Sequence, residues 1–260
     1  MREVSPEECK KLQLNILINV AKFCDEHDIK YSLAYGTLIG AIRHKGFIPW
    51  DDDIDIIMMR DEYERFVSMY KSEEFDLVDG DQQANHLKVR ISDRNTCLVF
   101  QNSETNNKYY ESGVWVDVFP IDMVPDNPLY YSFMKKTIKR LYLLMKVGEV
   151  RGPYLITKLL HPLLKPFSKP LLKIVRRMIV LFNGKNTHTL ANMSLWYLNY
   201  PPFPVEFMTK FVEVEFDGYN FKAISQYHEF LTSIYGDYMQ LPPLEKRVPR
   251  HGFITYWREG

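Results

Sequence analysis

Residues 49–59 read PWDDDIDIIMM, in which a run of carboxylates leads into an apolar stretch. Alternate side chains of a strand point to opposite faces, so a strand over 53–59 places Asp51, Asp53 and Asp55 on one face. The intervening isoleucines then point into a core. Neighbouring carboxylates repel one another at neutral pH, and a divalent cation that prefers oxygen ligands relieves that repulsion. The stretch therefore predicts a metal site on a strand.

Two further segments extend this site. Asp117 stands between two valines in a second apolar stretch, where an acid needs a partner. If the two strands are neighbours, Asp117 completes the metal site and accepts the proton of an acceptor hydroxyl. Gly36 and Thr37 stand at a strand-to-helix turn, where free amides and the helix dipole favour phosphate. Because two metal ions about 3.5–4 Å apart can activate an attacking oxygen and stabilise a leaving one, we expect phosphoryl transfer.

A solvated acidic turn or a calcium-binding loop is the alternative interpretation of the acidic run. Counting from Asp51 puts Glu62 at position twelve, where an EF-hand loop carries its bidentate glutamate. That loop needs glycine at its sixth position, which is Ile56 here, and the run that follows is too apolar for a loop. We therefore favour a catalytic metal site.

The chain of 260 residues is 46% hydrophobic and 14% aromatic, which is enough to bury a substantial core. Its three cysteines have no metal-ligand spacing, which disfavours a disulfide scaffold or a zinc site and favours a reducing, cytoplasmic setting. We expect neither a signal peptide nor a membrane span. His44, His86 and His251 show no ligand spacing either.

The hydrophobic pattern predicts an α+β fold with three parts. Residues 5–8 form a capping box that begins a helix over 5–27. Other expected helices are at 37–44, 61–70 and 224–235, and expected strands are at 31–35, 75–78, 87–92, 97–101, 114–119 and 209–216, with an irregular tail from 241. We assign 1–127 to a catalytic core, 128–205 to a basic helical subdomain interrupted by prolines, and 206–260 to a return to the core.

Two strings in the first part, YGTLIGAIRH at 35–44 and GFIPWDDDID at 46–55, resemble the LicD family. This family is a branch of the nucleotidyltransferase superfamily, whose signature is Gly-Gly/Ser, then Asp-x-Asp/Glu and a later Asp. Thr37 stands where that signature has Ser, and its long separation from Asp53 is typical of the LicD branch. The resemblance extends over about 29–125 and 216–247. The other sequence motifs that carry the resemblance lie at 88–90, 116–122 and 235–243 and at Lys246-Arg247.

The resemblance implies a nucleotidyltransferase-like mixed sheet with flanking helices. It also implies a phosphocholine transferase that uses CDP-choline, releases CMP and acts on a sugar hydroxyl of a lipid-linked teichoic acid or lipooligosaccharide precursor. Asp53, Asp55 and Asp117 then hold two Mg²⁺ ions, or Mn²⁺, with Asp117 as the base.

Three cations are candidates to neutralise the diphosphate of the donor: Arg43, Lys88 and Arg90. Arg43 can instead cap a helix, and the other two can form an ordinary polar strand face. For choline, the candidate aromatic faces are Trp50, Tyr109, Tyr110, Trp115, Trp196, Tyr235 and Trp257. The same fold could transfer ribitol phosphate or glycerol phosphate from a CDP donor. A non-catalytic, membrane-associated glycan-binding or assembly protein is the alternative of another class.

The formal net charge of zero hides a segregation of charge. Residues 129–205 contain 13 Lys or Arg and one acidic residue, Glu149, which leaves 20 basic and 32 acidic residues elsewhere. Within this segment, lysines and arginines alternate with leucines as in an amphipathic helix. We expect either peripheral docking on the anionic inner face of the plasma membrane or a helical lid, and the two are compatible. Nucleic acid is not expected, because no recognition module accompanies the lysines.

Overall fold

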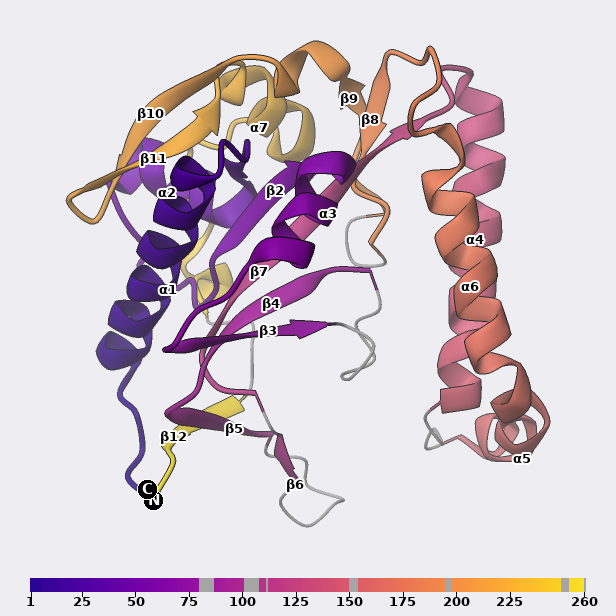
Figure 1. The fold of residues 1–260 in the computed structure, drawn as a ribbon, viewed down its shortest axis with the longest axis horizontal. Coiled ribbons are helices and arrows are strands. Elements are labelled where there is room, and N and C mark those ends of the chain that lie inside the picture. Colours follow the sequence, from indigo (N-terminus) through magenta and orange to yellow (C-terminus); the bar gives the residue numbers. More distant parts are fainter. Residues whose placement is uncertain are drawn as a thin grey trace. The chain divides into compact units, whose positions relative to one another are not determined.

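The computed structural model describes residues 1–79, 87–100, 108–110, 112–149, 154–194, 198–248 and 253–259. The chain forms two compact units. The first unit comprises Met1–Asp79, Val89–Phe119 and Phe207–Gly260, and the second comprises Gly80–Lys88 and Pro120–Glu206. Helices and several small sheets occur together in the chain (Figure 1), which confirms the predicted α+β class.

The first helix, α1 (Pro6–Glu26), begins with the predicted capping box. The Glu8 amide donates to Ser5 Oγ at 3.2 Å, and the Ser5 amide donates to the Glu8 carboxylate at 2.9 Å. One face of the helix is buried through residues that recur at helical spacing, including Ile16, Leu17 and Val20. Periodicity and capping thus predicted this helix correctly.

The main sheet of the first unit has the strand order β1-β2-β7-β4-β3. Its strands are β1 (Ser32–Leu33), β2 (Asp55–Met59), β7 (Trp115–Val124), β4 (Val89–Asp93) and β3 (Phe75–Asp79). The arrows of β2 and β7 run in the same direction (Figure 1), while β1–β2, β4–β7 and β3–β4 are antiparallel. The sheet is therefore mixed, as expected.

The described residues of the first unit also form three further α-helices, a hairpin and a small sheet. They are α2 (Tyr35–His44), α3 (Arg60–Met69), α7 (Tyr227–Tyr235), the hairpin β10 (Phe211–Phe216) and β11 (Tyr219–Ile224), and the sheet of β12 (Phe253–Trp257), β5 (Thr96–Phe100) and β6 (Lys108–Tyr110). Strands β11 and β12 were not predicted. Strand β11 lies just before the helix expected at 224–235, and β12 lies in the tail that was expected to be irregular.

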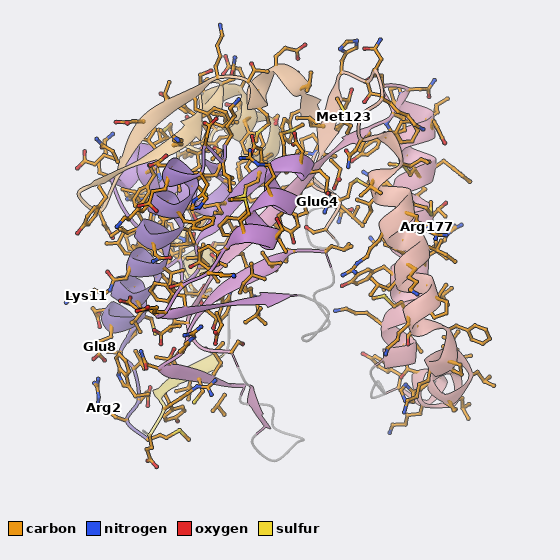
Figure 2. The ribbon with its side chains drawn as sticks, viewed as in Figure 1. Arg2, Glu8, Lys11, Glu64, Met123 and Arg177 are labelled. Carbon is orange, nitrogen blue, oxygen red and sulfur yellow. The ribbon has the colours of Figure 1, made fainter. Side chains whose placement is uncertain are left out.

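The second unit is built on α4 (Pro128–Glu149), α5 (Leu155–Leu164) and α6 (Ser168–Ile179). Its core joins Met134 and Ile138 of α4 to Val175 and Ile179 of α6. The end of β7 pairs with β8 (Thr189–Ala191), which pairs with β9 (Phe203–Pro204), so the helical pattern ends earlier than predicted. Figure 2 marks Arg177, an exposed cation of α6. No helix in the described part of the chain is long and apolar enough to span a bilayer.

The capping box gives a pH-dependent prediction. The hydrogen bond from Arg2 and that from the Ser5 amide lower the pKa of Glu8 from 4.5 to about 2. A carboxyl group whose pKa is lower in the folded state stabilises the fold at a pH above its unfolded pKa. That stabilisation is lost as the pH falls toward the folded pKa. We expect Glu8→Gln to be less stable than the wild type at neutral pH, with a difference that shrinks between about pH 4.5 and 2. Urea unfolding of both proteins over a series of pH values measures this difference in the free energy of unfolding.

Glu7→Gln is the matched control, because it removes a carboxylate from the same helical turn. It is expected to show a smaller pH-dependent difference, since the Arg2 guanidinium and the Ser5 amide donate to the carboxylate of Glu8. Equal pH dependence in the two variants would contradict the prediction.

Candidate active site

The carboxylates of Asp51, Asp52 and Asp53, here called the acidic loop, gather in front of β2. Each offers an oxygen, and these oxygens all lie within 4.8 Å of one another. All three side chains are partly buried. Three hard oxygen donors at this spacing are suited to a divalent cation such as Mg²⁺.

The acidic loop precedes the strand instead of belonging to it. Strand β2 begins at Asp55, so the expectation that Asp51, Asp53 and Asp55 share one strand face was wrong. The Asp51 amide donates to the Ile48 carbonyl at 3.0 Å, which forms a turn in place of an extended strand. The turn lets consecutive carboxylates converge, whereas a strand would point them to alternate faces.

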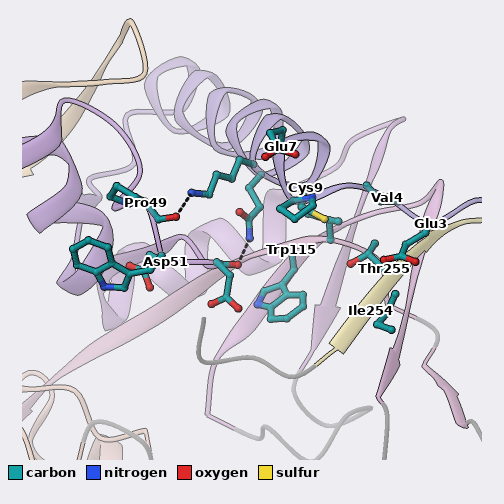
Figure 3. Close-up of a pocket in the computed structure, with 15 residues that line it drawn as sticks. Glu3, Val4, Glu7, Cys9, Pro49, Asp51, Trp115, Ile254 and Thr255 are labelled. Carbon is teal, nitrogen blue, oxygen red and sulfur yellow. Dashed lines mark hydrogen bonds between the residues drawn. The ribbon is translucent and has the colours of Figure 1, made fainter. Parts of the chain in front are cut away.

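Helix α1 fixes the backbone of this loop (Figure 3). Lys10 Nζ donates to the carbonyls of Ile48 at 3.4 Å and Pro49 at 3.2 Å, and Gln13 Nε2 donates to the carbonyl of Asp52 at 2.8 Å. Gln13 is only 3% exposed, although it lies on the apolar face of α1. A polar residue in an apolar helical stripe was the signal in the sequence that could have identified this contact.

Gly36 and Thr37, which were predicted to bind phosphate, contact the acidic segment directly. A Cβ atom on Gly36 would lie 2.4 Å from Asp51 Oδ2, so only glycine permits this approach. Thr37 Oγ1 is buried and accepts a hydrogen bond from the Asp55 amide at 2.8 Å. The start of α2 thus positions both ends of the acidic segment, and the phosphate role of these residues stays a prediction.

Asp117 lies beside the start of β2, as expected for neighbouring strands. Its amide donates to the Ile54 carbonyl at 2.9 Å, which places it between Asp53 and Asp55 in register. Its carboxylate is 3% exposed and forms an ion pair with Arg90 Nε at 3.0 Å. The Arg90 guanidinium also lies 4.2 Å from the centroid of the Trp115 ring. Arg90 was a predicted donor-binding candidate, and the structure shows it in an ion pair with Asp117.

The other two predicted cations have different surroundings. Arg43, near the end of α2, donates to the carbonyls of Tyr238 and Gln240 and to His44 Nε2. Lys88 is buried just before β4 and belongs to the second compact unit. Neither arrangement tests the expected contact with a diphosphate.

A cleft of about 460 Å³ opens beside the acidic loop. It is lined by segments that are distant in sequence: the start of α1, residues 49–52, Val114 and Trp115 of the β7 region, and residues 254–255 of β12. Of the aromatic residues considered for choline, Trp50 and Trp115 line it. Pro153, Trp196, His86 and His251 lie outside the described residues, as do the side chains of Tyr109 and Tyr110.

Comparison with known proteins agrees with this geometry. A family model described as "LicD/FKTN/FKRP, nucleotidyltransferase domain" matches residues 28–142. The lipopolysaccharide cholinephosphotransferase LicD of Haemophilus influenzae is 34% identical over 261 residues, which cover 96% of this chain and 97% of that protein. This chain belongs to the LicD family. The matched residues include α2, the acidic loop and Asp117, and the resemblance inferred from the motifs is confirmed.

Two more distant relatives match about half of the chain. An uncharacterized protein of Rickettsia typhi is 30% identical over 128 residues, covering 47% of this chain and 38% of that protein. An uncharacterized protein of Rickettsia prowazekii is 28% identical over 139 residues, covering 49% of this chain and 50% of that protein. Their names give no activity.

The Thr37 contact leads to a prediction about stability. Thr37→Val keeps the side-chain shape but leaves the Asp55 amide without its described acceptor, and an unsatisfied buried donor costs about 1–3 kcal/mol. Thr37→Ser keeps the hydroxyl and serves as the control. We expect the free energy of unfolding in urea to fall by that amount for Thr37→Val and by clearly less for Thr37→Ser. Equal losses would show that the hydroxyl does not support Asp55.

Proposed function

We propose that this protein transfers phosphocholine from CDP-choline to a sugar hydroxyl of a lipid-linked cell-surface glycan precursor, of the lipooligosaccharide or teichoic acid type, and releases CMP. The observation that carries the proposal is the 34% identity to the Haemophilus influenzae lipopolysaccharide cholinephosphotransferase over nearly the whole of both chains. Gathered carboxylates in the acidic loop support it, because phosphoryl transfer needs neutralisation of charge on phosphate oxygens.

The acidic residues fit a divalent metal. Their donor set consists of carboxylate oxygens, which Mg²⁺ and Mn²⁺ prefer. We assign Asp53, Asp55 and Asp117 as the ligands of two ions. Asp53 is part of the acidic loop, and the other two flank it through the Thr37 and Ile54 contacts. When bound, such ions polarise the transferring phosphate and acidify a hydroxyl that contacts them.

The chain's own residues handle the proton and the geometry of the step. The acceptor oxygen attacks the phosphorus atom of phosphocholine, its proton passes to an oxygen of Asp117, and the bond to the CMP oxygen breaks with its electron pair. The ion pair with Arg90 Nε, at 3.0 Å, holds the Asp117 carboxylate in a fixed orientation. The Arg90 contact with Trp115 keeps the guanidinium in place.

The carboxylates give the test of this function. Purified protein with CDP-choline, Mg²⁺ and a lipid-linked glycan precursor is expected to release CMP, and Asp53→Asn is expected to lower the rate by at least about a hundredfold, since the variant removes a charge at the metal site. Asp61→Asn removes an exposed acid from α3 and is the control, with a rate close to wild type.

Comparison of CDP-choline with CDP-ribitol and CDP-glycerol in the same assay identifies the donor. A preference for either alternative would replace phosphocholine while keeping the reaction class. Unchanged turnover in Asp53→Asn would contradict the mechanism. Absence of binding of Mg²⁺ and of every CDP-linked donor would favour the non-catalytic glycan-binding alternative.

We further propose that the second unit docks on the anionic inner face of the plasma membrane. Residues 154–182 contain six Lys or Arg and no acidic residue. The same stretch exposes large apolar side chains, including Tyr154, Ile156, Leu159, Leu163 and Phe167. Exposed apolar residues beside lysines are typical of helices that lie in a membrane interface, where each cation contributes about 1 kcal/mol.

Helix α5 is attached to α4 in a way that leaves its apolar residues outside. His161 Nδ1 lies 3.0 Å from the Val147 carbonyl, and a Cβ atom on Gly148 would lie 2.7 Å from the Leu164 carbonyl. Leu159 and Leu163 of α5 remain 63% and 66% exposed. A second copy of this chain is a poorer occupant of that face, because it would bring lysines against lysines.

Vesicle binding tests this docking. We expect the protein to co-sediment with vesicles containing phosphatidylglycerol more than with neutral phosphatidylcholine vesicles, and the binding to weaken with salt. The double variant Leu163→Ser, Phe167→Ser is expected to bind at least about tenfold more weakly, since each residue buries apolar area at the interface. Leu244→Ser removes a comparably exposed leucine, 76% exposed, from the first unit and is the control. Equal binding by both variants would contradict the assignment.

A further inference from the structure

Two arginines lie around Trp50: Arg247 lies over its ring, and Arg43 donates to His44, which packs on the same ring. Arg43 lies near the end of α2, and Arg247 follows the short helical turn Leu244–Lys246. Burial, and after it the positive charge of Arg247, lower the pKa of Arg43. Arg247 Cζ lies 5.2 Å from the centroid of the Trp50 ring. Within the described residues, neither guanidinium forms an ion pair.

Backbone carbonyls hold both guanidiniums in place. Arg43 uses Nε and Nη1 for His44 Nε2 and for the carbonyls of Tyr238 and Gln240, and Arg247 uses Nε for the Pro242 carbonyl at 2.8 Å. Hydrogen bonds to carbonyls orient the two groups but do not neutralise them. The Nη2 donors of Arg43 and both Nη groups of Arg247 have no described partner, so donors remain for an anion.

His44 contributes to the same cluster without adding charge. Its Nε2 accepts a hydrogen bond from Arg43 Nε at 2.9 Å, which requires that this nitrogen carries no proton. Burial, and after it Arg43, lower the pKa of His44, in agreement with the neutral form. The His44 ring packs edge-to-face on Trp50, with ring centroids 6.2 Å apart. The indole is thus fixed between a neutral imidazole and a guanidinium.

The position of this cluster indicates its ligand. Trp50 is the residue directly before the acidic loop and lines the cleft beside it. An anion bound by the arginines therefore lies next to carboxylates, which repel it unless a metal ion bridges them. A diphosphate can bind both the arginines and a metal ion held by the carboxylates, because some of its oxygens can accept from the two guanidiniums while others bind the metal.

We infer that Arg43 and Arg247 bind the diphosphate of the nucleotide donor, with Trp50 as the residue that positions Arg247. The inference rests on the proposed function for the identity of the donor. Arg43 was a candidate for this role from the sequence, whereas Arg247, about 200 residues further on, becomes one only through the contacts around Trp50.

Binding of CDP in Mg²⁺ buffer, measured by isothermal titration calorimetry, tests the assignment. We expect Arg247→Gln and Arg43→Gln each to raise the Kd for CDP by about tenfold or more, the effect of losing a charge-assisted hydrogen bond. Arg247→Lys keeps the charge but loses the planar fork and is expected to be intermediate. The control is Lys246→Gln, which removes an exposed neighbouring charge and is expected to change Kd by less than about threefold. Circular dichroism melts establish that each variant is folded.

The outcomes separate this inference from the proposed function. If folded Arg247→Gln binds CDP as tightly as the wild type, or no more weakly than Lys246→Gln, the inference is overturned even where phosphocholine transfer is observed. Weaker CDP binding by both arginine variants supports it, even if transfer from CDP-choline fails and another CDP donor is the substrate. A wild-type protein that does not bind CDP overturns it as well.

Discussion

One backbone hydrogen bond, from the Asp117 amide to the Ile54 carbonyl, joins the two acidic segments of this protein. The residues are more than sixty positions apart, and only the adjacency of β2 and β7 brings them together. With that register, a buried carboxylate lies beside the acidic loop, and Arg90 on the next strand compensates its charge. A slip of one residue would turn Asp117 to the other face and leave Arg90 without its acid. The candidate site therefore depends on strand register before it depends on any loop.

The acidic loop brings like charges together at an electrostatic cost. Contacts to neighbouring elements hold its backbone: the Lys10 ammonium and the Gln13 amide donate to carbonyls, and Gly36 leaves space for Asp51. These contacts fix the backbone that carries the three carboxylates. Such an arrangement sacrifices some stability for preorganisation, as is common where a protein binds metal or substrate.

Local sequence patterns predicted the elements whose stabilising contacts are local. Helix α1 carries its own cap, and the stretches predicted as strands at 75–78 and 114–119 match β3 and β7, of which β7 is buried. The predicted register of the acidic run was wrong, because the Asp51 amide donates to the Ile48 carbonyl in a turn and the strand begins only at Asp55. Strand β12 was missed because its hydrogen bonds go to β5, some 150 residues earlier, and nothing in its own sequence identifies that partner. For the same reason the sequence indicated the carboxylates but not the contacts of Gln13 or Arg247, which come from folding.

The charge segregation of the chain has a physical consequence for a reaction at a membrane. Acidic residues dominate outside the segment 129–205, and a negatively charged surface repels them, while the basic segment is attracted to it. If the basic segment docks on a membrane as proposed, tethering both parts in one chain would turn an encounter with a lipid-linked acceptor into a search in two dimensions at high effective concentration. The cations of the basic segment then need not recognise the acceptor at all. On that proposal, selection among acceptors would fall to the first unit, whose cleft is lined by polar and aromatic groups such as Glu7 and Trp115.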